Sequence, residues 1–224
     1  RYAIAVLKKT RIRGKRLTLG GTILTSERLR RMMEVRLLEL GFLGRHTIVA
    51  GGRQAADPHC VGTGPLAPHQ PIVLDVFPKS IQSGYHGDIT RTVIRGKASP
   101  PLKAMYEAVR DAQQRGISLV RHNADGKMVH EAVAAVMEKR GFRTGIIQGR
   151  PQGFIHGTGH GLGLDIHEPP RISRFSEKLK KGNVVTVEPG LYYQDLGGIR
   201  IEDVVYVTAN GCEVLTRLPK QFEI

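Results

Sequence analysis

The chain has 224 residues, of which 40% are hydrophobic, so it suits one large folded domain or two small ones and is not a disordered chain. No apolar run approaches the roughly 18 to 20 residues that span a bilayer, and the first residues lack the features of a signal peptide, so the sequence predicts a cytoplasmic protein without a membrane partner. The net charge of +14 includes a surplus of nine from the twelve Lys and Arg and three acids of residues 1–45. Because only Tyr2 and Phe42 are aromatic there, we expect a solvated basic face rather than a nucleic-acid or ribosome partner.

Residues 25–41 carry the pattern of an amphipathic helix. Thr25 or Ser26 can cap its N-terminus, and Gly41 can end it. The predicted apolar face consists of Leu29, Met32, Met33, Leu37 and Leu40.

The same design returns one hundred positions later without a gap, in a predicted helix that Asp125 caps and Gly141 ends. Another helix is predicted over 101–121, and residues 2–14 would be its counterpart in the first half. In each half, strand-like runs follow a glycine-rich segment, at 71–77, 87–96, 183–190 and 197–208. We therefore predict one α+β domain over 1–224, with pseudo-symmetric halves of about 1–99 and 100–224 that share a sheet and place a site between them.

Four acids fall in or beside these apolar runs, where an unpaired carboxylate is costly. Asp75 and Asp88 are thirteen residues apart, and Glu188 and Glu202 are fourteen apart. One histidine precedes each acid pair, His59 the first and His160 the second. Such an oxygen-rich set favours two ions such as Mn²⁺, Fe²⁺ or Co²⁺ over an all-thiolate zinc site, and predicts hydrolytic chemistry. A mononuclear or structural ion stays an alternative.

The stretch HGTGHGLGLDIHEPP, residues 156–170, holds three histidines among four glycines. The glycines argue against the helix that an HExxH zinc site requires, and favour an extended segment packed closely on another strand. In such a segment His156 and His160 share a face, whereas His167 returns to the site only if the chain bends. The three histidines are therefore expected to differ in role.

Together, HGTGHGLGLDIHEPP, TVEPG, GIRIED and GDITRT resemble the pita-bread-fold metallopeptidases, from about residue 25 to the C-terminus. The resemblance implies an α+β fold with two α/β halves around a shared curved antiparallel sheet. The run HGLGLDIHEPP is similar to the Xaa-Pro branch, which contains prolidase and Xaa-Pro aminopeptidase, rather than to the methionine aminopeptidase branch.

Residue by residue, the resemblance implies a dinuclear site with the metal ligands Asp75, Asp88, His160, Glu188 and Glu202. It places His59 and His167 at the scissile bond, where they would bind the substrate and pass protons, and His156 at the proline ring. Arg200 would support the bridging carboxylates beside the substrate, and Glu188 would take a proton from the attacking water. Mn²⁺ is the first expectation, with Co²⁺, Fe²⁺ or Zn²⁺ as alternatives. The implied substrate is a peptide with proline at its second position, and the implied assembly is a homodimer.

Two features depart from the family. The interval from Asp75 to Asp88 is about two residues longer than expected, so its hairpin should be enlarged. The N-terminal domain usual in Xaa-Pro peptidases is also absent from this chain, which predicts either the catalytic part of a longer protein or a short member. The alternatives are a methionine aminopeptidase-like or other amide hydrolase of the same fold, and a non-catalytic nucleic-acid- or ribosome-binding protein.

Overall fold

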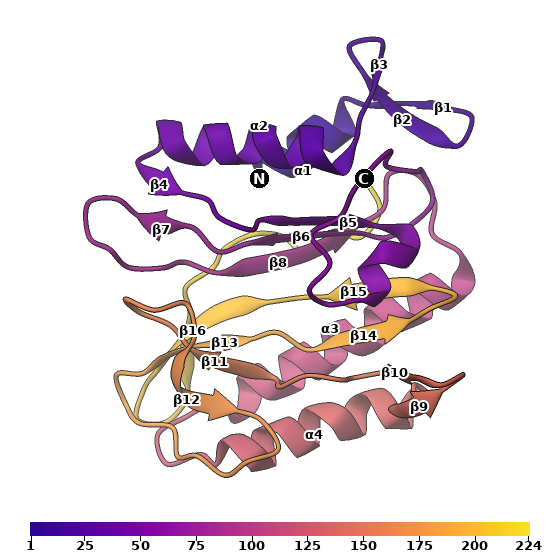
Figure 1. The fold of residues 1–224 in the computed structure, drawn as a ribbon. Coiled ribbons are helices and arrows are strands. Elements are labelled where there is room, and N and C mark those ends of the chain that lie inside the picture. The colour runs from indigo at the N-terminus through magenta and orange to yellow at the C-terminus, as the bar shows by residue number, and fades with distance from the viewer.

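The computed structural model describes residues 1–224 and combines helices with antiparallel strands, as the sequence predicts (Figure 1). The helices are α1 (Tyr2–Lys8), α2 (Ser26–Glu39), the 3-10 helix η1 (Gly52–Ala56), α3 (Pro100–Leu119) and α4 (Gly126–Lys139). Helices α2 and α4 begin and end one hundred positions apart, so the sequence repeat corresponds to a structural one. No helix combines the length and the apolar character needed to cross a bilayer.

The predicted caps form at both repeated helices. The Thr25 hydroxyl accepts a hydrogen bond from the Arg28 amide at 3.2 Å, and the Asp125 carboxylate accepts one from the Lys127 amide at 2.9 Å. The predicted apolar face of α2 is partly wrong, because Leu40 is 53% exposed. Leu40 is the C-cap, and Gly41 turns the chain away with a φ of +82°.

Seventeen strands, all paired antiparallel, form small sheets in each half. They are β1 (Arg11–Arg13), β2 (Arg16–Leu19), β3 (Thr22–Ile23), β4 (Phe42–Leu43), β5 (Ile48–Gly51), β6 (Ile72–Val76), β7 (Lys79–Ser80), β8 (Ile89–Val93), β9 (Gly145–Ile147), β10 (Arg150–Gln152), β11 (Gly159–Gly161), β12 (Glu168–Ile172), β13 (Val184–Val187), β14 (Gly190–Tyr193), β15 (Gly197–Arg200), β16 (Asp203–Val207) and β17 (Cys212–Val214). The predicted strand over 197–208 divides into β15 and β16, with Glu202 at the break.

The two halves meet where β8 lies beside the segment from β15 to β16. The first half contributes the sheet β5-β6-β8, and the second contributes β12-β11-β13-β16-β17. Across this seam the Glu202 amide donates to the Thr90 carbonyl at 3.1 Å, and the Arg200 amide donates to the Thr92 hydroxyl at 2.9 Å. Figure 1 shows α1 and α2 on one side of the strands and α3 and α4 on the other.

A buried ion pair holds the seam from behind. The Arg91 guanidinium lies 2.7 Å from the Asp203 carboxylate, and both side chains are buried. Asp203 also accepts hydrogen bonds from Gln113, Thr216 and Lys220. These donors lower the pKa of Asp203 although burial opposes them. The two opposite charges thus compensate each other, and the pair links β8, which contains Thr90, to β16, which follows Glu202.

The C-terminal segment joins the two main cores. Phe222 lies in the core under α3 and stacks on Tyr106 with ring centroids 4.1 Å apart. Ile224 packs against the other core, under α1 and α2. Between them, Ile94 donates its amide to the Phe222 carbonyl and accepts from the Ile224 amide. The last residues therefore staple one half to the other.

Removing the Phe222 ring should destabilise the protein strongly. Phe222→Ala leaves a cavity in the core at a position that is only 9% exposed, so the free energy of unfolding should fall by about 3–5 kcal/mol. Urea unfolding followed by circular dichroism measures the loss. Phe175→Ala is the control, since Phe175 is 63% exposed and its loss should cost less than about 0.5 kcal/mol. An equal loss of unfolding free energy in the two variants would show that Phe222 does not help to hold the two cores together.

Candidate metal centre

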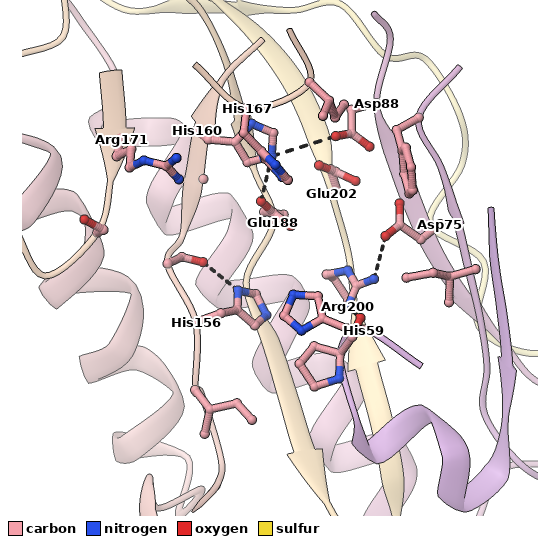
Figure 2. Close-up of a pocket in the computed structure, with 18 of the residues that line it drawn as sticks. His59, Asp75, Asp88, His156, His160, His167, Arg171, Glu188, Arg200 and Glu202 are labelled. Atoms are coloured by element: carbon pink, nitrogen blue, oxygen red, sulfur yellow. Dashed lines mark hydrogen bonds and ion pairs between the residues drawn. The ribbon is translucent and has the colours of Figure 1, made fainter. Parts of the chain in front are cut away.

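A cavity of about 950 Å³ opens at the seam and is lined by both halves (Figure 2). All nine residues that the sequence singles out for a site lie in its wall: His59, Asp75, Asp88, His156, His160, His167, Glu188, Arg200 and Glu202. The structure therefore brings together side chains that are up to 143 positions apart along the chain, from His59 to Glu202.

The four acids stand at strand ends or breaks next to the seam. Asp75 is the fourth residue of β6, Asp88 precedes β8, and Glu188 follows β13. Glu202 occupies the break between β15 and β16. Thr90, two residues beyond Asp88 and on the same strand face, donates its hydroxyl to the Glu202 carboxylate at 2.8 Å. Each half thus positions part of the other half's acid pair.

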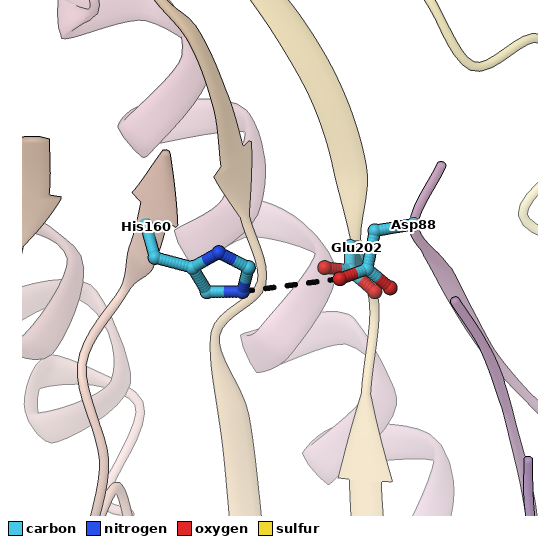
Figure 3. Close-up of side chains that lie close together, drawn as sticks. All are labelled: Asp88, His160 and Glu202. Carbon is cyan, nitrogen blue, oxygen red and sulfur yellow. Dashed lines mark ion pairs between the residues drawn. The ribbon is translucent and has the colours of Figure 1, made fainter. Parts of the chain in front are cut away.

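Three of the predicted ligands form a tight buried group. Ligand atoms of Asp88, His160 and Glu202 all lie within 4.8 Å of one another (Figure 3). The Nε2 atom of His160 lies 3.8 Å from Asp88 Oδ2 and 3.2 Å from Glu188 Oε1. Glu188 therefore joins the group through His160, whereas Asp75 stands beside it in contact with Arg200.

The hydrogen bonds of His160 leave one ring nitrogen for a cation. Its Nδ1 lies 3.0 Å from the Gly161 carbonyl, so Nδ1–H donates and a neutral ring would point the Nε2 lone pair at the carboxylates of Asp88 and Glu188. Lone pairs that face each other repel unless a proton or a metal ion lies between them. The arrangement is that of a metal-ligating histidine with a backbone partner.

Three buried carboxylate oxygens have no hydrogen-bond partner: Asp75 Oδ1, Asp88 Oδ1 and Glu202 Oε1. Unpaired buried acceptors are costly, and charged ones more so. Burial, together with the neighbouring carboxylates, raises the pKa of Asp88 and of Glu202 well above the ordinary value. A group of acids that resists ionisation on its own fits divalent cations, which would satisfy the three oxygens at once.

Arg200 holds Asp75 and leads into a second hydrogen-bonded chain. Its guanidinium lies 2.7 Å from Asp75 Oδ2 and donates to the Tyr192 hydroxyl at 2.7 Å. Burial raises the pKa of Asp75 in spite of this pairing. The Arg200 side chain is therefore engaged in positioning.

His156 ends that chain as a neutral ring. Its Nε2 lies 2.8 Å from the Tyr192 hydroxyl and its Nδ1 lies 2.7 Å from the Gly157 carbonyl, so both nitrogens are occupied. Burial lowers the pKa of His156 to about 4. The ring therefore offers the cavity a carbon edge or face, which suits an apolar ligand group.

His59 and His167 line the cavity from opposite halves and are exposed to solvent. The ring of His167 meets that of His160 edge to face, with centroids 4.3 Å apart. Burial, followed by the influence of His160, lowers the pKa of His167. A neutral imidazole beside the candidate ligands is able to donate or accept a proton near neutral pH.

The glycines of residues 156–163 allow close backbone packing, as the sequence predicts. A Cβ atom at Gly159 would collide with the Thr186 carbonyl, and one at Gly161 would approach the Pro169 carbonyl. The segment is not helical, and Gly159–Gly161 forms strand β11, which pairs with β12 and β13, so the predicted extended segment packed on another strand is confirmed for these residues. The chain then bends over 162–167, which returns His167 to the site.

The hairpin between Asp75 and Asp88 reaches the other half. Strand β7 pairs with β4, and beyond it the His86 amide donates to the Gly163 carbonyl at 2.8 Å. This contact ties the hairpin to the bend that carries His167. Its enlargement relative to the family stays a prediction.

Some residues of the site escape the sequence analysis. Tyr192 links His156 to Arg200, and His130 on α4 hydrogen-bonds Thr158 at 2.9 Å and lines the cavity. Arg171 lines it from β12. The period-2 alternation after Asp88 could have indicated Thr90. Tyr192, His130 and Arg171 reach the site through contacts between distant segments, which no local sequence pattern reveals.

The sequence is similar to those of known metallopeptidases. The model of metallopeptidase family M24 matches residues 3–209. The chain is 36% identical over 177 residues to the Xaa-Pro dipeptidase of Pyrococcus furiosus, which covers 78% of this chain and 48% of that protein. The chain thus spans about half the length of this relative.

Solved structures show the same architecture. The X-Pro aminopeptidase of Thermotoga maritima aligns with a TM-score of 0.81 and 32% identity, over 90% of this chain and 55% of that one. The prolidase of Pyrococcus horikoshii aligns with a TM-score of 0.84 and 27% identity, over 99% of this chain and 59% of that one. These similarities confirm the predicted pita-bread fold.

Without metal, Asp88 should destabilise the folded protein near neutral pH. Folding raises the pKa of Asp88, so its contribution to stability is present below the unfolded value, about 4, and is lost as pH rises. In EDTA at pH 7, the free energy of unfolding of Asp88→Asn should therefore exceed that of the unmodified protein by about 1–3 kcal/mol, so the variant should unfold at a higher temperature, and the difference should close near pH 4.

Metal should reverse this order. Added Mn²⁺ should raise the unfolding temperature of the unmodified protein near neutral pH and have a much smaller effect on Asp88→Asn, because a ligand is lost. Differential scanning calorimetry, paired with elemental analysis, measures both effects. An unfolding temperature that EDTA and Mn²⁺ leave unchanged would show that these acids do not form one metal site.

Proposed function

Because this chain belongs to metallopeptidase family M24, we propose that it carries the active site of a dinuclear-metal-dependent hydrolase that removes an N-terminal residue linked to proline. The observation that carries the proposal is the convergence of four carboxylates and His160 around unpaired buried oxygens, in a cavity that five further histidines line. The names of similar proteins, an Xaa-Pro dipeptidase and an X-Pro aminopeptidase, support the substrate class.

We propose that two ions would be held by Asp75, Asp88, His160, Glu188 and Glu202, with Asp88 and Glu202 as the ligands that both ions would share. The oxygen-rich donor set favours Mn²⁺, with Co²⁺, Fe²⁺ or Zn²⁺ as alternatives. When bound, two such ions supply Lewis acidity for the scissile carbonyl and lower the pKa of the attacking water.

Glu188 is proposed to take the proton of that water. Without metal, burial raises the pKa of Glu188, but a proton on His160 outweighs burial through its hydrogen bond and charge and lowers it. A divalent ion in the place of that proton would likewise keep the carboxylate ionised. An ionised carboxylate at the cavity wall is able to accept a proton as the oxygen–carbon bond forms. The same proton is available for the proline nitrogen when the carbon–nitrogen bond breaks.

His59 and His167 are proposed to act at the substrate carbonyl. They line the cavity from the two halves, so a peptide bound in it would lie between them. Each imidazole N–H would stabilise the negative charge that develops on that oxygen. These hydrogen bonds would stabilise the carbonyl oxygen while Glu188 transfers the proton.

His156 is proposed to contact the proline ring. Its nitrogens are already bound to Tyr192 and Gly157, so it presents only carbon to the cavity. Phe154 packs beside it, with ring centroids 5.4 Å apart, and also lines the cavity. An apolar wall at this position suits a cyclic side chain that lacks an N–H donor.

The organisation of the whole protein is also a proposal. We infer a single catalytic domain with halves of about 1–99 and 100–224, acting as a homodimer in the cytoplasm. Arg200 is proposed to serve the substrate site by holding Asp75 and Tyr192 in place rather than by direct binding.

Peptidase activity tests the proposal directly. The purified protein with Mn²⁺ or Co²⁺ should release the first residue from X-Pro di- and tripeptides, measured by chromatography of the products. Glu188→Gln should lower kcat by about 10²–10⁴, as expected for loss of a general base. Metal content is measured in parallel, because Glu188 is also a proposed ligand.

The matched substrate is the corresponding X-Ala peptide, which differs only at the second position. Folded, metal-loaded protein that cleaves neither peptide would disprove the proposed activity. Protein that cleaves both equally would retain the hydrolase but reject the proline specificity.

Replacing His156 should reduce selectivity rather than chemistry. In His156→Ala the ratio of kcat/KM for X-Pro over X-Ala should fall by about 10-fold or more, since an apolar wall of the proline pocket is lost. The metal content should stay the same, because His156 is not a proposed ligand. An unchanged ratio would place the proline ring elsewhere in the cavity.

A further inference from the structure

Strands β1, β2 and β3 form a short three-stranded ribbon at the edge of the molecule, beside α1 (Figure 1). The ribbon is fixed to the body by Leu17, which is fully buried and packs in the core with Leu24 and Leu66. The Arg28 guanidinium of α2 also donates to the Leu19 carbonyl at 3.2 Å. The ribbon is therefore anchored to the rest of the protein, and its outer side chains have defined positions.

Six cations crowd on and next to this ribbon without an acidic neighbour in sequence. They are Lys8, Lys9, Arg11, Arg13, Lys15 and Arg16, and all six are exposed. Residues 1–26 contain no Asp or Glu. No ion pair of the structure involves a residue before Arg36. A solvated face normally mixes both signs of charge, so a face that carries only cations attracts anions.

The strand register gathers three of these cations on one face. Arg11 and Arg13 are two residues apart, and Arg16 lies opposite Arg13 in the neighbouring strand. Thr18, opposite Arg11, completes the row. With Lys9 and the turn at Gly20 and Gly21, the residues Arg11, Arg13 and Thr18 line an open groove that has no apolar side chain. The charges recur at about 6.6 Å along the strand, a spacing that suits a linear polyanion.

We propose that the outer face of this ribbon binds the phosphate backbone of a nucleic-acid duplex without reading its sequence. A ribbon of two or three strands is narrow enough to follow a duplex groove. The turns at its ends, Gly14-Lys15 and Gly20-Gly21, carry no apolar side chain that would enter a lipid bilayer, so an anionic membrane is disfavoured.

The sequence alone favours a solvated face, because the basic segment lacks aromatic side chains for base stacking. Phosphate contacts do not need them, since they depend on charge and on hydrogen bonds to Arg, Lys and Thr side chains. Three features of the structure favour phosphate binding over a solvated face: the ribbon is anchored, cations are aligned on one of its faces, and they have no acidic partner. The site lies outside the cavity at the seam, so it is independent of the proposed peptidase activity.

The test is the salt dependence of binding to a fluorescein-labelled DNA duplex of 20 base pairs, measured by anisotropy with two unrelated sequences. Contact of about four or five cations with phosphates gives a slope of log K against log salt of about −3.5 to −4.5. Both sequences should bind alike, within about twofold, and vesicles containing anionic lipid should bind more weakly than the duplex.

Two variants with the same change in net charge locate the binding. Arg11→Glu/Arg13→Glu should weaken duplex binding by about tenfold or more near 50 mM salt. The matched control, Lys180→Glu/Lys181→Glu, reverses two exposed cations far along the chain and should change it less than about twofold. Arg11→Gln/Arg13→Gln should lie between them, and thermal unfolding confirms that each variant is folded.

Three results would overturn the proposal. They are no duplex binding by the unmodified protein near 50 mM salt, equal losses in the ribbon and control variants, and tighter binding to anionic vesicles than to the duplex. The first would leave the ribbon as a solvated face, the second would indicate net charge alone, and the third would indicate a membrane surface.

Discussion

The acids at the seam between the two halves cannot all be ionised unless cations lie among them. Asp88 and Glu202 are buried, stand within reach of each other, and each keeps one oxygen without a partner. Burying the two carboxylates side by side costs free energy through lost hydration and mutual repulsion. The neighbouring structure is arranged to reduce this cost: Thr90 donates to Glu202, and Arg200 pairs with Asp75. What the protein leaves unsatisfied is the part that divalent ions would satisfy.

The seam also explains why the site needs both halves. Asp75 and Asp88 belong to the first half, while His160, Glu188 and Glu202 belong to the second, so small shifts between the halves would alter the distances from the first pair to the other three. Several contacts resist such shifts. The buried pair of Arg91 and Asp203 acts from behind, and Phe222 and Ile224 staple the two cores. A rigid frame of this kind is what a site of closely spaced ligands requires, because misplacement by an ångström weakens both binding and chemistry.

How far the sequence predicts this molecule depends on the distance over which each signal acts. Local signals succeed: Thr25 and Asp125 cap the repeated helices, and acids within apolar runs mark the site. The break at Glu202 and the exposure of Leu40 are missed, because strand ends and helix ends depend on tertiary packing. The chain from Arg200 through Tyr192 to His156 is missed for a different reason: it needs the register of β14 against β15 and the position of a loop, and neither leaves a periodic pattern.

The site and the basic ribbon pose the same electrostatic problem in opposite environments. Each gathers charges of one sign, and the protein's own groups compensate them only in part at the site and not by any ion pair on the ribbon. At the buried site the charges interact strongly and resist ionisation, so a bound cation is held tightly and salt has little influence. On the exposed ribbon each charge is hydrated and interacts weakly, so binding arises from the sum of several contacts and from the release of counterions, and it falls steeply with salt. Burial therefore decides which of the two behaves as a structural and chemical centre and which as a reversible surface.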